Sequence, residues 1–243
     1  MTGRIRGALG ALGLLAMGAT TPVTAQAQEV QSYTVSIAGL NVGTASLAVN
    51  TAGDRYSAEA RIRGRGLVGR LFDFGYVGNS SGRIVSNFKL QPDQYRANKN
   101  SSGETRAYYL DYRGGLPVRA ETVPPTNFPQ YAPDPSKLGG SLDPISAAWT
   151  LLRDVPVGQA CNRSTMVYDA SRSFRVWLQP REQAGDLWSC AGAYSREGGF
   201  SPRKLAEQKV FPFKVFFRED AGMMRAVRVE VVTTYGTARA TRN

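Results

Sequence analysis

The sequence contains no histidine at all. Histidine is the side chain that most often serves as a general acid or base near neutral pH, and it is the commonest metal ligand. Only two cysteines are present, and no apolar run approaches the ~20 residues that a membrane-spanning helix needs. We therefore expect no histidine-based catalysis, no metal site, no cofactor and no transmembrane anchor.

The first residues have the pattern of a secretory signal. Arg4 and Arg6 give a positive start, and residues 8–19 are apolar and uncharged. Ala25-Gln26-Ala27 then offers the small residues that a signal peptidase recognises. We predict a signal peptide over residues 1–27 that is cleaved on export, and a mature protein located in the periplasm.

The two cysteines, Cys161 and Cys190, allow one pairing in an oxidising compartment. Closing a loop of about 30 residues stabilises a folded chain by roughly 3–4 kcal/mol in the chain-entropy model. A reactive or metal-binding pair is the alternative, but the two residues are far apart in sequence and no histidine accompanies them. We predict a structural disulfide.

Apolar and polar residues alternate along most of the remaining chain. Tyr56, Ala58, Ala60 and Ile62, for example, alternate with charged and small polar residues. This period of two is typical of strands with one buried face. Strands are expected near 33–37, 44–49, 55–63, 74–86, 104–113, 165–169, 172–179, 186–195, 210–218 and 225–241. So many sequential strands predict a mostly β fold, with a strongly curved antiparallel sheet that is barrel-like or spiral.

One amphipathic helix interrupts the strands, over about residues 144–153. Asp143 is a good N-cap and Pro144 suits the first helical position. Four apolar residues follow at helical spacing: Ile145, Ala148, Trp149 and Leu152. A shorter helix is expected from Pro202 to Gln208.

Residues 123–135 contain five prolines and are expected to form an extended surface crossing before the main helix. This segment could also be a ligand for a proline-recognition domain, although a plain connector is the simpler interpretation. No repeat or linker divides residues 28–243, so we predict a single antiparallel β domain.

Three patterns suggest chemistry, but none is supported by its context. Residues 64–69 match the dinucleotide pattern G-x-G-x-x-G but are not followed by a helix-like sequence. Residues 78–82 match the nucleophile pattern G-x-S-x-G without a histidine base, and we expect a turn there. Asp111, Asp143 and Asp169 could form a carboxylate pair, but nothing in their spacing joins them. We therefore predict no catalytic, cofactor-binding or metal-binding residues.

A ligand site is the remaining possibility. A short helix does not necessarily fill the concave face of a sheet of ten or more strands, and the unfilled space could hold an acyl chain. Arginines after the third strand would bind an anionic headgroup at the rim. The predicted ligand-binding residues are Arg63, Arg65, Leu67, Arg70, Phe72, Phe74 and Tyr76. Ordinary core packing by the apolar members of this set is the alternative.

The formal net charge is +11 at pH 7, and most of the positive residues are arginines. Outside the cytoplasm the available anionic partners are lipid headgroups and acidic polymers of the cell envelope, and not nucleic acid. A basic surface that only keeps the protein soluble explains the charge equally well. The sequence leaves the oligomeric state open.

Several stretches match a known family pattern: Gly140 to Ala147, Cys190 to Arg196, Gly199 to Pro202, Phe211 to Phe213 and Tyr235 to Arg239. On these residues the chain resembles the uncharacterised bacterial periplasmic family known as domain of unknown function 3108. The resemblance implies a periplasmic location and one domain. It supplies no catalytic residues to carry over.

These observations favour a non-enzymatic periplasmic binding or cell-envelope maintenance protein, with lipid or another amphipathic envelope component as its ligand. One alternative is a protein–protein adaptor that docks through a basic face. Another is a histidine-free glycan hydrolase with paired carboxylates. An outer-membrane barrel also fits a signal followed by alternating strands. However, the proline-rich crossing, the helix and the non-aromatic last residue argue against it.

Overall fold

The computed structural model describes residues 26–65, 74–86, 89–101, 103–126 and 128–243. Almost all of the predicted signal peptide lies outside these residues. Gln26 and Ala27 are within them and already belong to the first strand, where they pair with Ala52 and Thr51. Cleavage after Ala27 would therefore shorten this strand by its first two residues.

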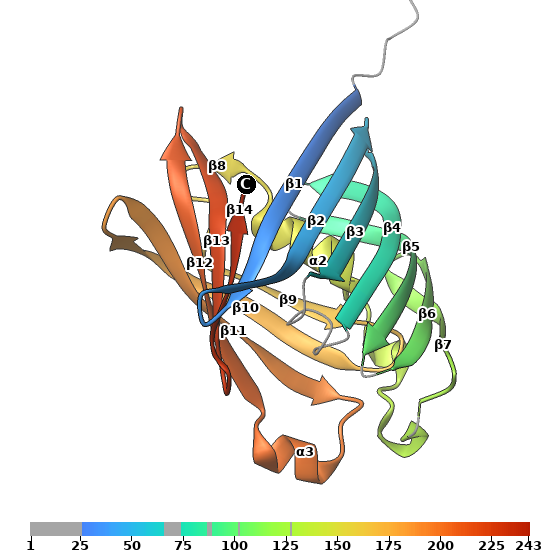
Figure 1. Cartoon of the computed structure of the whole chain (residues 1–243). Helices are drawn as coiled ribbons and strands as arrows, with labels where there is room; N and C mark the ends of the chain where they lie inside the picture. The colour runs from blue at the N-terminus through green and yellow to red at the C-terminus, as the bar shows by residue number, and fades with distance from the viewer. Residues whose placement is uncertain (1–25, 66–73, 87–88, 102, 127) are drawn as a thin grey trace, which may run out of the picture.

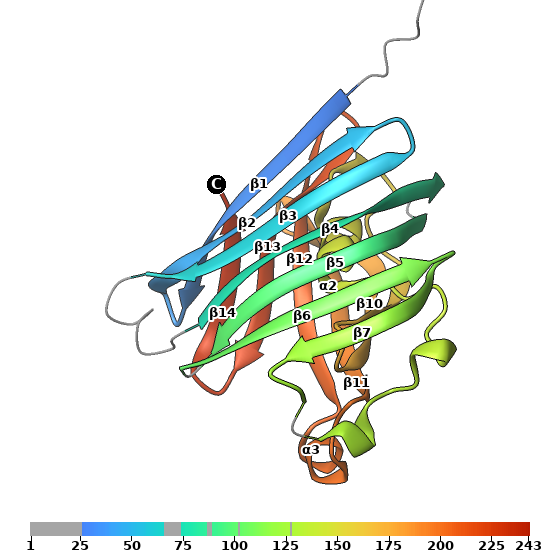
Figure 2. The same ribbon diagram turned by 90° about the vertical axis from the view of Figure 1, so that its right-hand side faces the viewer.

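The described residues form one antiparallel sheet of 14 strands (Figures 1 and 2). The first seven strands are β1 (Gln26–Ile37), β2 (Leu40–Ala52), β3 (Arg55–Gly64), β4 (Phe74–Ser86), β5 (Lys89–Ser101), β6 (Glu104–Arg113) and β7 (Leu116–Val123). The others are β8 (Val155–Pro156), β9 (Arg163–Tyr168), β10 (Ser173–Ala184), β11 (Leu187–Gly198), β12 (Val210–Asp220), β13 (Met223–Thr233) and β14 (Gly236–Arg242). The prediction of a mostly β, antiparallel protein is confirmed.

The order of the strands divides the sheet into two halves. Strands β1 to β7 form one meander and β9 to β14 form the other, with β8 paired only to β13. The first and last strands join the halves, since Tyr33 to Ile37 pair with Arg242 to Ala238. The sheet is not closed, because the order begins at β7 and ends at β9. Figure 1 shows the two halves on opposite sides of the main helix, α2 (Pro144–Leu152).

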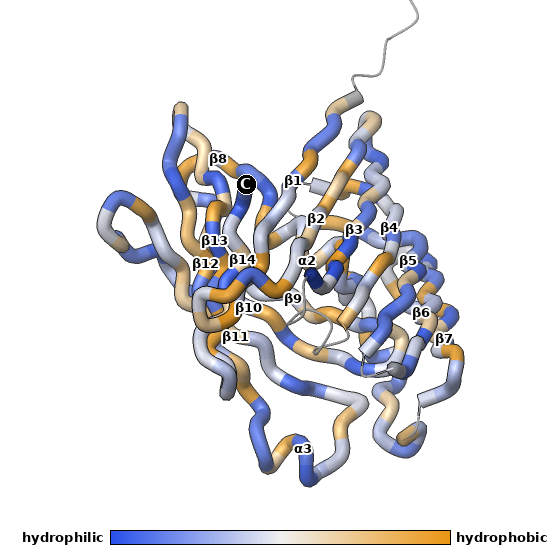
Figure 3. The backbone as a smooth tube through the Cα atoms, in the orientation of Figure 1, coloured by the Kyte–Doolittle hydropathy of each residue, from blue (hydrophilic) through white to orange (hydrophobic). Residues whose placement is uncertain are grey.

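The period of two predicted the buried faces correctly. In β3, Tyr56 and Ala58 are buried, whereas Arg55, Ser57 and Glu59 are exposed. Figure 3 shows hydrophobic and hydrophilic residues following one another along the strands. A strand of this kind turns one side to the interior and the other to water. In β12 the alternation is broken, since Val215, Phe216 and Phe217 are all buried.

Three predictions about strands need correction. Strands β5, β7 and β8 were not predicted, and each contains a proline: Pro92, Pro117 and Pro156. Pro92 lies opposite Gly82, beside a register shift. The expected strand 225–241 is two strands joined by a turn at Tyr235. The turn expected at 78–82 is wrong: these residues lie inside β4.

The main helix is capped as predicted but is not clearly two-sided. The carboxylate of Asp143 accepts hydrogen bonds from the backbone N–H groups of Ile145 (2.9 Å) and Ser146 (3.1 Å). None of the helical residues is exposed, and the buried ones include the polar Ser146 and Thr150, so burial does not follow one apolar stripe. The predicted short helix is present as α3 (Pro202–Glu207), capped by Ser201.

The proline-rich crossing contains two short 3-10 helices, η1 (Pro129–Tyr131) and η2 (Pro135–Lys137). The predicted disulfide is present. It joins Cys161, which precedes β9, to Cys190 of β11, with 5.9 Å between the Cα atoms. Both residues belong to a core cluster beneath β12 and β13, where Cys190 is fully buried. In the described part of the chain, no helix is long and apolar enough to cross a bilayer.

Candidate ligand-binding cavity

One side of α2 packs firmly against the first half of the sheet. Ile145 and Trp149 are both almost fully buried, in a core cluster that includes Tyr56 of β3 and Tyr95 of β5. The rings of Trp149 and Tyr56 lie 5.4 Å apart, centroid to centroid. This side of the helix therefore belongs to a filled hydrophobic core.

A buried polar cluster holds the N-terminal end of the helix in place. The carboxylate of Asp143 accepts hydrogen bonds from the hydroxyls of Ser80 (2.7 Å) and Ser146 (2.6 Å). The hydroxyls of Tyr56 and Ser146 are also 2.7 Å apart. Burial raises the pKa of Asp143, because a charged carboxylate is costly in such surroundings. The serine in the G-x-S-x-G pattern is thus a structural partner of a helix cap.

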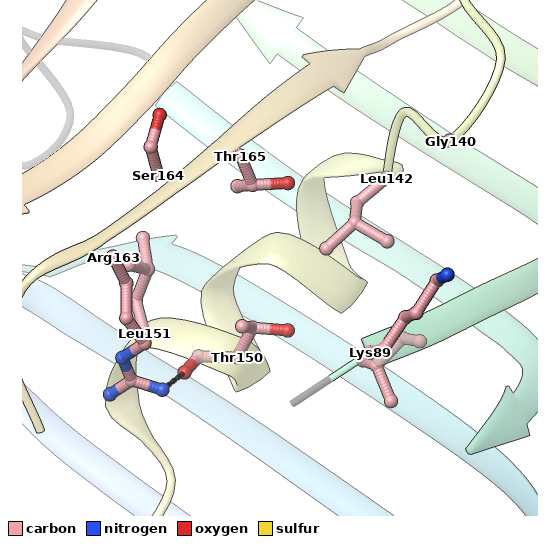
Figure 4. Close-up of a pocket in the computed structure, with 9 residues that line it drawn as sticks. Lys89, Gly140, Leu142, Thr150, Leu151, Arg163, Ser164 and Thr165 are labelled. Carbon is pink, nitrogen blue, oxygen red and sulfur yellow. Dashed lines mark hydrogen bonds between the residues drawn. The ribbon is translucent and has the colours of Figure 1, made fainter. Parts of the chain in front are cut away.

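The C-terminal end of α2 is tied to both halves of the sheet. The indole N–H of Trp149 donates to the carboxylate of Glu29 in β1 (3.0 Å). From β9, the guanidinium of Arg163 donates to the carbonyl oxygen of Thr150 (2.7 Å), and burial lowers the pKa of Arg163 to about 10. Figure 4 shows this contact at the edge of a cavity of about 300 Å³ between α2, β5 and β9. That cavity has mixed polar and apolar walls, and its arginine already binds the helix.

The other side of α2 faces open space. Ala148, Leu151 and Leu152 line a cavity of about 540 Å³ between the helix and strands β10 to β13. The strands contribute an almost continuous apolar wall: Phe174, Val176, Tyr194, Phe213, Val215, Val229 and Val231. We call this space the apolar cavity. Its volume lies within the roughly 300–1,000 Å³ typical of small-molecule sites.

The register of the strands explains why these side chains share one wall. Residues directly opposite each other in an antiparallel pair point to the same face. Val176 lies opposite Tyr194, and Phe213 lies opposite Val231. Phe213 also lies opposite Gly192, where an added Cβ would come within 2.9 Å of the Phe213 ring. A glycine at this position therefore allows the ring to lie flat against β11.

Two arginines stand at one end of the apolar cavity. Arg196 of β11 is half-buried, and its guanidinium donates to the carbonyl oxygens of Lys204 (2.6 Å) and Gln208 (2.9 Å). Arg172, just before β10, is exposed. The ring of Phe200 lies between them, 5.3 Å from the guanidinium carbon of Arg172 and 5.2 Å from that of Arg196. The cavity is thus apolar along its length and cationic at one end.

A smaller polar cavity adjoins this cationic end. It measures about 190 Å³, and Asp169 and Arg172 line both cavities. Its other charged residues are Lys99 of β5 and the ion pair Arg106–Glu104 of β6, whose atoms are 2.8 Å apart. We call this space the polar cavity.

Four of the predicted ligand-binding residues are among those described, Arg63, Arg65, Phe74 and Tyr76, and none of these four lines the apolar cavity. Arg63 and Arg65 are exposed, and Leu67, Arg70 and Phe72 lie outside the described residues. The ammonium nitrogen of Lys99 lies over the ring of Phe74, 5.6 Å from the ring centroid. Tyr76 is half-buried, and its hydroxyl is 3.2 Å from that of Tyr95. The ligand-binding role of this set stays a prediction.

The sequence did not reveal Lys99, Arg172 and Arg196, nor the aromatic residues of the apolar wall, which are Phe174, Tyr194 and Phe213. They come from β5, the β9–β10 turn and strands β10 to β12, and only the strand pairing brings them together. The alternation predicted strands over residues 172–179 and 186–195. No local pattern indicates that the helix leaves them uncovered.

The three aspartates considered for catalysis have separate roles. Asp111 pairs with Arg96 and Arg119, and Asp143 caps α2. Asp169 accepts hydrogen bonds from the backbone N–H groups of Ser171 (2.9 Å) and Arg172 (2.7 Å). No hydrogen bond joins any two of them, and the described residues contain no cluster of three potential metal ligands.

The fold and the cavity together define an open antiparallel β protein with one buried helix and an apolar cavity beside it. The model of a family described as "Protein of unknown function (DUF3108)" matches residues 32–185. The chain belongs to this family, as its resemblance predicted. The matched range includes α2 and Arg172, whereas Arg196, β12 and β13 follow it. Comparison with curated proteins and with solved structures finds no match.

Proposed function

We propose that this protein is a non-enzymatic binding protein of the bacterial periplasm, exported by a cleaved signal peptide, that holds one small amphipathic envelope component in the apolar cavity. The observation that carries the proposal is a cavity of about 540 Å³ with an apolar wall and a cationic end. In our account the sheet curves around α2, and the ligand occupies the part of its concave face that the helix leaves open.

The way the helix packs supports this account. Trp149 and Ile145 fill the side toward the first half of the sheet, while the smaller Ala148 faces the second half. Protein interiors are normally close-packed, and an unfilled space lined by large apolar groups forfeits dispersion contacts. An apolar ligand in the cavity would restore these contacts, and this supports a binding function.

The test is a binding measurement on a pair of variants in one strand. Val231 lines the apolar cavity, whereas its neighbour Val232 is 78% exposed on the opposite face of β13. Val231→Trp should fill part of the cavity and weaken binding of a fluorescent C16 fatty-acid probe by about tenfold or more, since a ring displaces several buried methylene groups. Val232→Trp makes the same change on the outer face and should leave the affinity unaltered.

Two results would contradict the proposal. One is that the unmodified protein does not bind the probe at micromolar concentrations. The other is that both tryptophan variants bind as well as the unmodified protein, because the probe would then lie outside the apolar cavity. Circular dichroism and thermal unfolding of both variants must show a folded protein for the comparison to be valid.

A further inference from the structure

We propose that the ligand carries an anionic headgroup, a carboxylate or a phosphate, and that Lys99 and Arg172 bind it in the polar cavity. This inference rests on the proposed function, because the headgroup belongs to a ligand whose chain lies in the apolar cavity. It adds the chemical class of that ligand and a second set of binding residues.

The position of the polar cavity is the first argument. It meets the apolar cavity at Asp169 and Arg172, which line both. A molecule with its chain between α2 and Val231 would therefore present its head to these residues. The polar cavity is also much the smaller, at about 190 Å³ against about 540 Å³, so it suits a headgroup and not a second chain.

The balance of charge is the second argument. Three cationic side chains line the polar cavity against two carboxylates, those of Asp169 and Glu104. Glu104 is committed to Arg106, and Asp169 to two backbone N–H groups. Within the part of the chain that the structure describes, Lys99 and Arg172 have no ion-pair partner within 4.0 Å. Asp169 offsets part of their charge, because it interacts electrostatically with both. Three cations against two carboxylates leave the lining with a net charge of +1, which an anion from outside the chain can neutralise.

The aromatic rings beneath these cations are the third argument. The ammonium of Lys99 lies over the ring of Phe74, and the guanidinium of Arg172 lies over that of Phe200. Such contacts restrain long side chains that would otherwise move freely in water. The cations are therefore held in place before an anion arrives, which reduces the entropy that binding costs.

Electrostatics at Lys99 agree with this arrangement. Burial lowers the pKa of Lys99, and the nearby positive charges of Arg172 and Arg106 lower it further, against the opposite effect of Asp169. Burial and like charge therefore both disfavour the protonated amine. A bound anion would favour it.

The experiment compares three C16 probes below their micellar concentrations: palmitate, 1-palmitoyl lysophosphatidate and the neutral 1-monopalmitoylglycerol. Each is titrated by displacement of a fluorescent fatty acid. The unmodified protein should bind at least one of the two anions about tenfold more tightly than the neutral lipid, as expected for one or two charge-assisted hydrogen bonds. Preference for both anions shows that a carboxylate suffices, and preference for lysophosphatidate alone shows that the site needs a phosphate.

The variant Lys99→Gln/Arg172→Gln should bring the affinity for the preferred anion down to that for the neutral lipid, without changing the latter. Lys209→Gln/Arg175→Gln is the matched control. It also removes one lysine and one arginine charge, at two exposed positions: Lys209 just before β12 and Arg175 on β10. Neither residue lines the apolar cavity or the polar cavity. If the first double variant does not fold, Arg172→Gln alone, at an exposed position, gives the same comparison.

The outcomes separate the two proposals. Equal binding of all three probes by the unmodified protein overturns the headgroup site and leaves the cavity function intact. An equal loss in the control variant also overturns it, because general attraction by the basic protein would then explain the preference. Failure of all three probes to bind refutes the proposed function itself.

Discussion

Replacing the buried helix cap by Asp143→Ala should destabilise the protein in a way that depends on pH. The change removes an N-cap, which is worth about 1 kcal/mol. It also removes the acceptor for the hydroxyls of Ser80 and Ser146, and a buried donor left without a partner costs about 1–3 kcal/mol. Ser80 and Ser146 still lie 2.9 Å apart and can bond to each other. We therefore expect a total loss of about 2–4 kcal/mol in the free energy of unfolding.

The pH dependence follows from the direction of the pKa shift. Burial raises the pKa of Asp143 in the folded protein above the value of about 3.9 in an unfolded chain, so the folded state holds the proton more tightly. The stability that this group contributes is fully present below the unfolded pKa, and it is lost as the pH rises through the folded pKa. The destabilisation by Asp143→Ala should therefore be largest at low pH and should decrease as the pH rises.

The assay is urea unfolding, followed by circular dichroism at several pH values between 4 and 8. Asp134→Ala is the matched control, because Asp134 caps η2 in an exposed position by accepting hydrogen bonds from Ser136. These bonds lower the pKa of Asp134, so its contribution is present above the unfolded pKa and is lost as the pH falls. A destabilisation by Asp143→Ala that grows with pH, as expected for Asp134→Ala, would refute the reasoning. It would show that the hydrogen bonds outweigh the cost of burial.

Three further predictions concern the disulfide, the core and export. Replacing Cys161 and Cys190 together by alanine should lower the free energy of unfolding by about 3–4 kcal/mol, because the disulfide spans a sequence separation of 29. Two free thiols, shown by alkylation and intact mass of the native protein, would contradict this. Trp149→Ala should cost about 3–5 kcal/mol in urea unfolding, since only 4% of Trp149 is exposed; a loss below 1 kcal/mol would show that it packs loosely. Protein recovered from the periplasm should begin at Gln28 by N-terminal sequencing, and a start at Met1 would disprove cleavage.

The period of two predicted most strands because one face of the sheet is buried and the other is wet. That contrast is clear in β3, with Tyr56 and Ala58 inside and Arg55 and Glu59 outside. The same contrast exists in β5, where Leu90, Pro92, Tyr95 and Ala97 are buried, but the register shift beside Pro92 breaks the period of two in the sequence. Polar residues such as Gln31 can also be buried when they find a partner: its side chain donates to the carbonyl oxygen of Leu152 (3.0 Å). Partners of this kind are distant in sequence and cannot be predicted from local patterns.

The helix could be predicted from its cap because the signal is local. Asp143 followed by Pro144 favours the start of a helix, and this preference does not depend on the rest of the fold. The surroundings of the helix have no such local signal. Ala148 and Trp149 are neighbours in the chain, yet one faces the apolar cavity and the other a filled core.

The candidate site could not be predicted because it depends on long-range pairing. Arg172 and Arg196 come together only because Phe174 lies opposite Arg196 in the β10–β11 pair. The sequence did predict an unfilled space with arginines at its rim. It named Arg63, Arg65 and Arg70, of which Arg70 lies outside the described residues and the other two do not line the apolar cavity. The arginines that do line it, Arg172 and Arg196, could be found only from the strand pairing.

The central claim, that the apolar cavity holds an amphipathic molecule, is tested most directly by mass spectrometry of the protein purified from its native periplasm. Small molecules are extracted from the unmodified protein and from the Val231→Trp and Val232→Trp variants, and they are compared at equal protein amounts. We predict one class of anionic amphiphile in the unmodified protein and in Val232→Trp, and at least a tenfold depletion in Val231→Trp. The absence of any amphiphile, or equal amounts in all three proteins, would contradict the account.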